Sequence, residues 1–219
     1  MKMTQLIAST VLLASAFLAG SAAAEEKKME VGITATMASM EVMHNGSKVT
    51  IQRNQDQAAT VNPDFAKTSR KCPPFCIQPI SLAPGVETIG EVEMIHYLKK
   101  VSDGDKNLMV IDSRTPDWVA KGMIPGAVNI PYTDLDTKQN QLKAEEILEK
   151  QFNVKVLDIG KYDFKKAKTL VMYCNGMWCG QSPTNIKFLL SIGYPADKIK
   201  WYRGGMQDWE ILGLTTVKP

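Results

Sequence analysis

Residues 169–183 read TLVMYCNGMWCGQSP, and the organisation of the whole chain can be worked out from this stretch. Its first five residues form a short, nearly continuous apolar run, which is typical of a parallel strand buried on both faces. Cys174 follows directly, and a loop with two glycines comes next. Ser182, with a proline after it, predicts a helix start with Ser182 as N-cap. We expect Gly193 to end that helix.

Strands and helices alternate on both sides of this stretch. A capping-box spacing at Thr88 predicts the start of the first helix. Such alternation predicts an α/β fold with a mostly parallel sheet. The further strands are expected at 108–112, 124–131 and 199–202, and the helices at 88–100, 116–121, 140–151 and 206–212.

Composition excludes several classes of protein. The 219 residues are 44% hydrophobic and 22% charged, as in a globular protein of one or two domains. Lys and Arg total 26 against 23 for Asp and Glu, and this small excess argues against nucleic-acid binding. Two histidines, His44 and His96, are too few for a His-rich metal site, and we expect no metal or cofactor.

Residues 1–24 have the pattern of a secretory signal peptide. Lys2 supplies the positive start, Leu6–Leu18 is apolar, and the small residues that end at Ala24 fit a cleavage site. The apolar stretch is short for a membrane span, and no later segment is long enough. We therefore expect a periplasmic or secreted protein without stable membrane insertion.

Residues 25–84 differ from the rest of the chain. Asn45-Gly46 lies between two β-prone runs, which predicts a β-hairpin with a type I′ turn. A lone hairpin is marginally stable in water. We expect it to pack on the larger domain, or to recruit a protein partner by edge pairing.

A second pair of cysteines, Cys72 and Cys76, lies in the sequence KCPPFCIQP at 71–79. Its three prolines exclude a regular helix or a central strand, so the segment is a rigid connector. The two cysteines fit a structural disulfide, or an exchange partner for the Cys174 loop. A metal site of all four thiols fits the spacings least well. Four cysteines allow three pairings, and the sequence does not choose among them.

Cys174 is a candidate nucleophile because of its position. Ligands bind at the carboxyl ends of the strands in open α/β sheets. A helix N-terminus presents free N–H groups and a positive dipole end, and both favour thiolate over thiol. Such a thiolate can attack a sulfur atom, a phosphorus atom or a disulfide. The alternative is an inert cysteine buried at the end of a strand.

The region from Thr88 to Lys218 resembles the rhodanese-like sulfurtransferase domain. The matching motifs occur in the family's order, and they imply its three-layer α/β fold with a mostly parallel central sheet. The chain would then comprise a signal peptide (1–24), a β-hairpin and Cys/Pro-rich connector (25–84) and a rhodanese-like domain (85–219). The motifs are VIDSRTPDW at 110–118, GMIPGAVNIP at 122–131, LVMYC at 170–174, GY at 193–194, YRGGM at 202–206, and Trp209.

The resemblance implies a mechanism of two steps. Cys174 attacks the outer sulfur of a small sulfur-containing anion such as thiosulfate, becomes a persulfide, and passes that sulfur to a thiol acceptor. Asp112 and Arg114 would support the loop, or would form a structural ion pair. The backbone of the loop would hold the persulfide and the substrate; this loop consists of Asn175, Gly176, Met177, Trp178, Cys179, Gly180, Gln181 and Ser182.

The chain departs from the family pattern at three points. The loop is long, since Ser182 lies eight residues after Cys174, and this predicts a wider pocket. Met123 stands where the family often has histidine. The loop holds a second thiol, Cys179, but no Arg or Lys, which argues against a phosphatase. Trp178 could form a pocket wall, whereas Trp201 and Trp209 are expected in the core.

Three functions follow from these observations. The first is an exported sulfurtransferase that carries sulfane sulfur on Cys174. The second is a thiol–disulfide or persulfide redox protein in which Cys179 resolves Cys174, with Cys72 and Cys76 as further thiols. The third is a non-catalytic binding module with structural or idle thiols. Replacement of Cys179 by serine separates the first two, since only the redox cycle needs that thiol.

Overall fold

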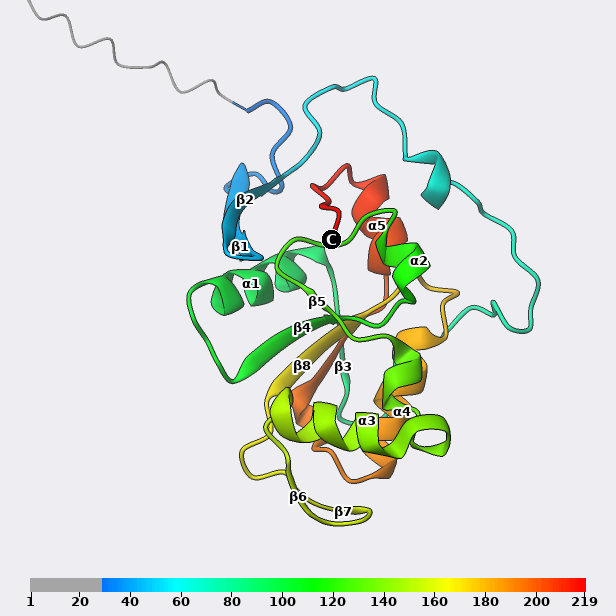
Figure 1. Ribbon diagram of the computed structural model, residues 1–219. Coiled ribbons are helices and arrows are strands. Elements are labelled where there is room, and N and C mark those ends of the chain that lie inside the picture. The colour runs from blue at the N-terminus through cyan, green and yellow to red at the C-terminus, as the bar shows by residue number, and fades with distance from the viewer. Residues whose placement is uncertain (1–28) are drawn as a thin grey trace, which may run out of the picture.

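A five-stranded sheet forms the centre of the computed structural model, which describes residues 29–219 apart from the side chains of 137–139. The predicted signal peptide lies outside the described residues. The strand order is β3-β9-β8-β4-β5, and every neighbouring pair is parallel (Figure 1). The strands are β3 (Glu87–Ile89), β4 (Leu108–Asp112), β5 (Val128–Asn129), β8 (Thr169–Tyr173) and β9 (Ile199–Tyr202).

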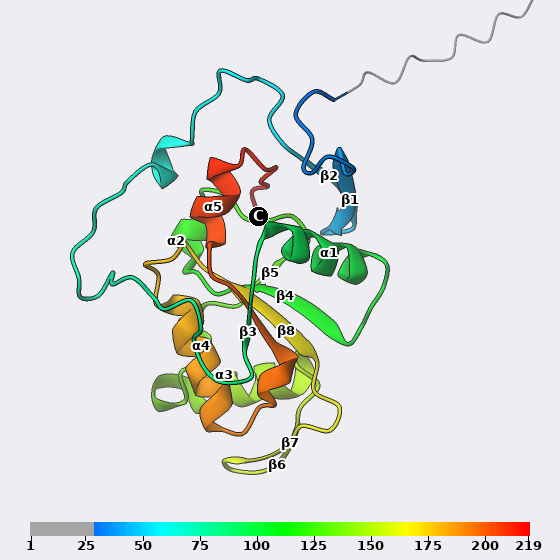
Figure 2. The ribbon, with the colours of Figure 1, turned by 180° about the vertical axis from the view of Figure 1, so that it is seen from behind.

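Helices cover both faces of the sheet, so the predicted three-layer α/β fold is confirmed (Figures 1 and 2). Among the described residues, no helix has both the length and the apolar character to cross a membrane. The helices are α1 (Glu91–Ser102), α2 (Pro116–Val119), α3 (Thr137–Lys150), α4 (Gln181–Ser191) and α5 (Gly205–Ile211). Short 3₁₀ turns occupy Pro63–Phe65, Tyr132–Leu135 and Ala196–Lys198, and a small hairpin joins β6 (Lys155–Asp158) to β7 (Lys161–Asp163).

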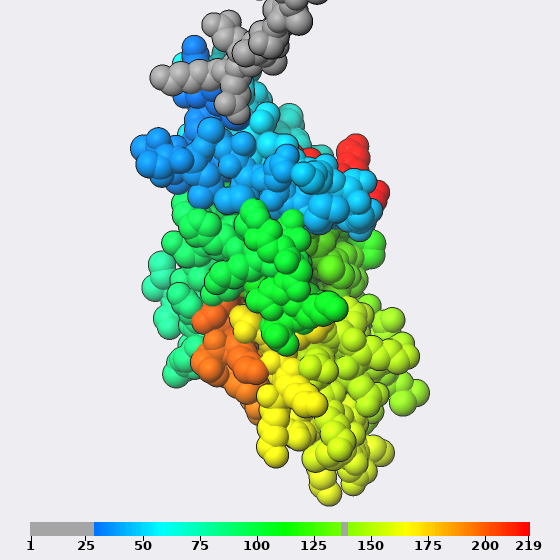
Figure 3. Space-filling view, turned by 90° about the vertical axis from the view of Figure 1, so that its left-hand side faces the viewer, coloured from blue at the N-terminus to red at the C-terminus, as the bar shows by residue number. Residues whose placement is uncertain are grey.

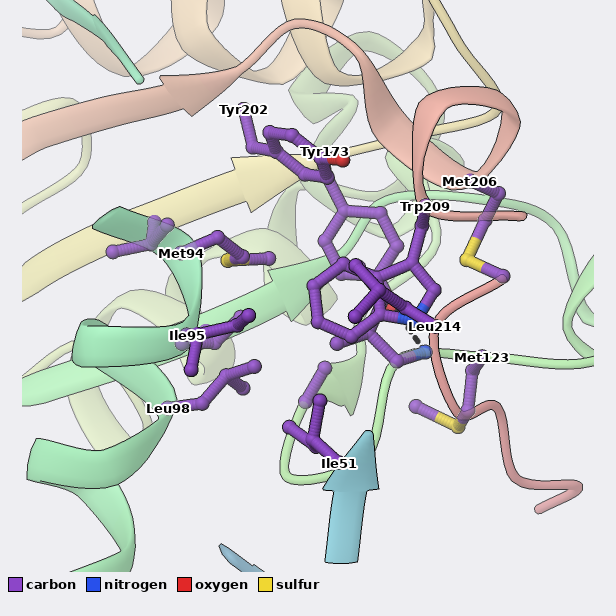
Figure 4. Packing of buried hydrophobic residues seen from close by; sticks show 14 of the residues in the cluster. Ile51, Met94, Ile95, Leu98, Met123, Tyr173, Tyr202, Met206, Trp209 and Leu214 are labelled. Carbon is purple, nitrogen blue, oxygen red and sulfur yellow. Dashed lines mark hydrogen bonds between the residues drawn. The ribbon is translucent and has the colours of Figure 1, made fainter. Parts of the chain in front are cut away.

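Two hydrophobic cores arise from the alternation of side chains along the strands. On β8, Val171 and Tyr173 point to one core and Leu170 and Met172 to the other. The first core also receives α1, α2, α5 and the N-terminal hairpin, and Figure 4 shows how its members meet around Trp209. The second core is covered by α3 and α4. Both faces of β8 are therefore buried, as its apolar sequence predicts.

The N-terminal hairpin packs on the larger domain. It consists of β1 (Ser39–His44) and β2 (Ser47–Gln52), and the positive φ values of Asn45 (49°) and Gly46 (78°) give the predicted turn. Val42 and Ile51 are buried in the first core. Figure 3 shows this blue segment lying over the green part of the domain.

The first helix begins later than its sequence predicts. Thr88 lies in β3, where β-branched residues extend the chain and pair with β9, instead of opening α1. Gly90 is the true N-cap, and its N–H donates to Glu93 Oε2 over 3.2 Å. The strand expected at 124–131 is shortened to Val128–Asn129, because prolines on both sides cannot donate to a strand ladder.

Candidate active site

Cys174 lies at the carboxyl end of β8, between the neighbouring strands β4 and β9. Helix α4 begins at Gln181 with Gly180 as N-cap, so the prediction that Ser182 is the N-cap is wrong. Ser182 belongs to the first turn of the helix, and its hydroxyl donates to Cys174 Sγ over 3.3 Å. The same hydroxyl accepts a hydrogen bond from Trp201 Nε1 over 3.2 Å, which leaves its proton for the sulfur.

Cys179 is the disulfide partner of Cys174 in this structure. Their Cα atoms are 6.3 Å apart, and each residue is only 3% exposed. The long loop between them is what lets the second thiol return to the first. The structure therefore shows the oxidised form of the site.

Helix α5 holds the loop from the other side. The N–H groups of Met206 and Gln207 donate to the carbonyls of Cys174 and Asn175 over 2.9 and 3.0 Å. This close approach requires Gly205, which has a φ of 58°, because a Cβ there would lie 2.8 Å from the Gly176 nitrogen. The YRGGM motif thus positions the loop.

Asp112 and Arg114 form a fully buried ion pair below the loop. Arg114 donates to both oxygens of Asp112 and to the Gly122 carbonyl, the last over 2.6 Å, and its Nη1 lies 3.5 Å from Asn175 Oδ1. Burial lowers the pKa of Arg114, but the hydrogen bonds and charge of Asp112 outweigh this effect and raise it. The guanidinium is thus held by Asp112 and by a backbone carbonyl, with Asn175 of the loop beside it.

Met123, which stands where the family often has histidine, lies in the hydrophobic core. It is 3% exposed and belongs to the first core with Trp209 and Leu214 (Figure 4). Trp209 and Trp201 are buried, as the sequence predicts. Position 123 therefore contributes apolar packing to the first core in this chain.

The connector with the second cysteine pair lies directly on the loop. Cys72 and Cys76 form a disulfide with a Cα–Cα distance of 4.7 Å. Two residues further on, the N–H of Gln78 donates to the Met177 carbonyl over 2.8 Å. The Phe75 ring meets the Trp178 ring edge-on, with the centroids 5.7 Å apart. The proline-rich segment and the loop after Cys174 are therefore packed together.

Arg203, the residue directly after β9, binds this connector. Its guanidinium donates to the carbonyls of Gln78 and Pro79 over 2.7 and 3.2 Å. Since Arg203 belongs to the YRGGM motif, one motif holds the loop through Met206 and the connector through Arg203. The sequence gives no signal for this second contact.

Arg70 brings a positive charge to the loop, which has none of its own. Its guanidinium carbon lies 3.7 Å from the centroid of the Trp178 ring, a cation–π contact. Its Nε is buried and has no hydrogen-bond partner among the described residues. Burial lowers the pKa of Arg70, yet the group stays cationic because its ordinary pKa is far above neutrality. Sequence reasoning missed Arg70, since no motif links it to the loop.

The described residues hold no cluster of metal-ligating side chains. No group of three or more His, Cys, Asp or Glu side chains lies together there, and the four cysteines are paired as two disulfides. The polar groups at the loop include the Ser182 hydroxyl, the Arg70 guanidinium, backbone amides, and the side-chain amides of Asn175, Gln181 and Gln207. Together they suit a reactive sulfur and an anionic substrate.

A comparison with protein-family models finds a match to most of the domain. The model described as "Rhodanese-like domain" matches residues 94–212, more than half of the chain. No curated protein matches the sequence. Among solved structures, a rhodanese-related protein from Thermoplasma volcanium is 22% identical, and the match covers 61% of this chain and 99% of that one with a TM-score of 0.38.

Two further solved structures carry different descriptions. A single-domain sulfurtransferase from Saccharomyces cerevisiae is 16% identical, with 57% of this chain and 88% of that one covered and a TM-score of 0.37. A protein from Rhodopseudomonas palustris described as a possible tyrosine phosphatase is 19% identical, with 62% and 88% covered and a TM-score of 0.42.

Proposed function

The chain belongs to the rhodanese-like domain family, and we propose that it is a sulfurtransferase that carries sulfane sulfur as a persulfide on Cys174. The observation that carries this proposal is the position of the Cys174 sulfur. It lies at the end of β8 and at the first turn of α4, with the Ser182 hydroxyl 3.3 Å away. Helix N–H groups and a hydroxyl donor both stabilise a thiolate, which is the attacking species.

The reaction has two balanced steps. The Cys174 thiolate attacks the outer sulfur of thiosulfate, the S–S bond of the donor breaks, and sulfite leaves with the electron pair. The product is a Cys174 persulfide anion. An acceptor thiolate then attacks the terminal sulfur of that persulfide, and the Cys174 thiolate leaves. Neither step requires a cofactor.

A second candidate function is favoured by the Cys174–Cys179 disulfide. The Cys179 thiolate can attack the inner sulfur of the persulfide and expel hydrosulfide. The two cysteines are then oxidised to the observed disulfide, and the carried sulfur is reduced to sulfide. This route makes the protein a reductase of sulfane sulfur, and an external dithiol must restore its thiols.

The compartment proposed for this chemistry is the periplasm or the exterior of the cell. Two features support it: the pattern of a signal peptide at 1–24, and the pairing of all four cysteines as disulfides. Disulfides persist in oxidising compartments outside the cytoplasm.

Intact-mass spectrometry of the reduced protein after incubation with thiosulfate tests the function. The wild type and Cys179→Ser are expected to gain about 32 Da, the mass of one sulfur atom held as a persulfide. Cys174→Ser is expected to gain nothing. If the wild type instead releases hydrosulfide and forms the disulfide while Cys179→Ser keeps its persulfide, the reductase is correct. A gain in Cys174→Ser, or no gain in any variant, contradicts both.

Replacing Arg70 tests how the donor anion is recognised. Arg70→Gln is expected to raise the KM for thiosulfate about tenfold, a loss of about 1.4 kcal/mol, with a smaller change in kcat. Lys71→Gln is the matched control, because Lys71 is an exposed neighbouring cation. Steady-state kinetics at low and high salt measure both variants. An unchanged KM in Arg70→Gln would place the donor elsewhere on the loop.

A further inference from the structure

We propose that Cys72 and Cys76 form a second redox pair, which passes electrons from an external protein dithiol to the Cys174–Cys179 disulfide. The inference deepens the proposed function, on which it rests, by naming the route that returns an oxidised site to its thiols. It arises from the difference in exposure between the two disulfides and from the packing of the connector on the catalytic loop.

The catalytic disulfide is closed to a protein reductant. Cys174 and Cys179 are each 3% exposed, and the loop above them is covered by the connector. Thiol–disulfide exchange requires the attacking thiolate to reach a sulfur atom, so access limits its rate. Cys72 is exposed and Cys76 is partly buried. The outer disulfide is therefore the one that a large dithiol protein can reach.

The connector also holds its disulfide next to the loop that contains Cys179. Gln78 is hydrogen-bonded to Met177, and Phe75 contacts Trp178, so the connector touches the loop on both sides of Cys76. Cys179 directly follows Trp178 in the loop. Since the chain has four cysteines in all, these are the thiols within the molecule that can exchange.

Cations, and no carboxylates, lie next to the connector's cysteines in the sequence. Arg70 and Lys71 directly precede Cys72, Arg203 binds the carbonyls after Cys76, and no Asp or Glu occurs between residues 65 and 86. Neighbouring cations lower the pKa of a cysteine and raise its thiolate fraction.

The exchange is balanced at every step. An external dithiol reduces Cys72–Cys76 to two thiols and becomes a disulfide. The Cys76 thiolate attacks the Cys179 sulfur, which forms a mixed disulfide and releases the Cys174 thiolate. The Cys72 thiolate then attacks the Cys76 sulfur, restores the outer disulfide, and releases Cys179. Two electrons move inward, and Cys174 is ready to accept sulfur again.

Reduction kinetics with two reductants form the first test. The oxidised wild type and the double variant Cys72→Ser/Cys76→Ser are treated with thioredoxin or with a small phosphine, and free Cys174 and Cys179 are counted by alkylation and mass. With thioredoxin the variant is expected to react about tenfold more slowly or worse, because exchange depends on access. With the phosphine the two rates are expected to agree closely.

A trapping experiment locates the exchange. Cys72→Ser/Cys174→Ser retains Cys76 and Cys179, and the matched control Cys76→Ser/Cys174→Ser retains Cys72 and Cys179. After mild oxidation, we expect a Cys76–Cys179 crosslink in monomers of the first variant, seen as a loss of about 2 Da and a linked peptide, and much less crosslink in the control. A disulfide forms only where the Cα atoms come within about 7 Å.

Failure of the relay can be distinguished from failure of the proposed sulfur transfer. Cys72→Ser/Cys76→Ser, reduced by the phosphine, is expected to form the Cys174 persulfide like the wild type, which also shows that its loop is intact. Equal reduction rates with thioredoxin, or an absent Cys76–Cys179 crosslink, overturns the relay and leaves sulfur transfer untouched. Loss of persulfide formation in this variant would overturn the relay as well, because the pair would then be a structural part of the site.

Discussion

Replacing Arg114 with methionine is expected to lower the free energy of unfolding by about 3–5 kcal/mol, because it leaves the Asp112 carboxylate buried without its partner. Arg114 also binds the carbonyls of Gly122 and Trp118, and these lose their donor as well. Urea unfolding followed by circular dichroism measures the change. The expected loss is a large share of the stability of an ordinary domain.

A double variant and a surface variant serve as controls for this prediction. Asp112→Asn/Arg114→Met is expected to be less destabilised than Arg114→Met, since the second change removes the uncompensated charge. Lys99→Met, which breaks the exposed Lys99–Asp103 pair, is expected to change stability by less than about 0.5 kcal/mol. Equal losses of unfolding free energy in Arg114→Met and Lys99→Met would show that the buried pair stabilises the fold no more than an exposed pair does.

Replacing Gly205 with alanine is expected to slow persulfide formation about 100-fold, since a misplacement near 1 Å is enough for such a loss. The added Cβ would collide with the Cys174 carbonyl and lie 2.8 Å from the Gly176 nitrogen, at a positive φ that alanine disfavours. The loop must move away, and the hydrogen bonds from Met206 and Gln207 break with it. Rapid mixing with thiosulfate and acid quenching, followed by mass spectrometry, measures the rate.

Gly180→Ala is the matched control for Gly205→Ala, at the other end of the same loop. Gly180 has a φ of −90°, and a Cβ there meets nothing within 4 Å. We expect its persulfide to form within a few-fold of the wild-type rate, because neither strain nor a clash results. Similar losses in both variants would mean that the loop is sensitive to any substitution, and that the close approach at Gly205 is not the cause.

Local patterns were enough to predict most of the central architecture. The apolar runs at 108–112, 169–173 and 199–202 are strands in the structure, because a buried parallel strand shows itself in a continuous apolar sequence. The turn at Asn45-Gly46 was equally clear, since few residues tolerate its φ values. The predicted helix start at Thr88 is wrong, although the spacing of a capping box is present there. Thr88 is β-branched and lies in the edge strand β3, and the pairing of β3 with β9 favours the strand over the helix.

The residues of the candidate site also fall into two groups: those predicted from consecutive sequence, and those that depend on contacts between distant segments. Cys174 and its loop could be placed from sequence, since strand end, loop and helix start are consecutive. The sequence predicts that the Ser182 hydroxyl caps the helix backbone, whereas in the structure it donates to the Cys174 sulfur. Arg70 and the packing of Gln78 on Met177 could not be predicted, because these contacts join segments far apart in the sequence and depend on the path of an irregular connector.

The N-terminal hairpin has a consequence for the order in which the polypeptide can fold. Its edge is completed by residues near the other end of the chain: Arg53 pairs with Leu214, and the N–H of Thr215 donates to the carbonyl of Gln52. During synthesis the hairpin emerges before these partners, since Thr215 follows Gln52 by 163 residues. A ribosome-bound chain halted before Leu214 should thus leave Val42 and Ile51 without a finished core. Completion of this core therefore waits for the segment around Leu214, and slow folding is expected from contacts of such long range.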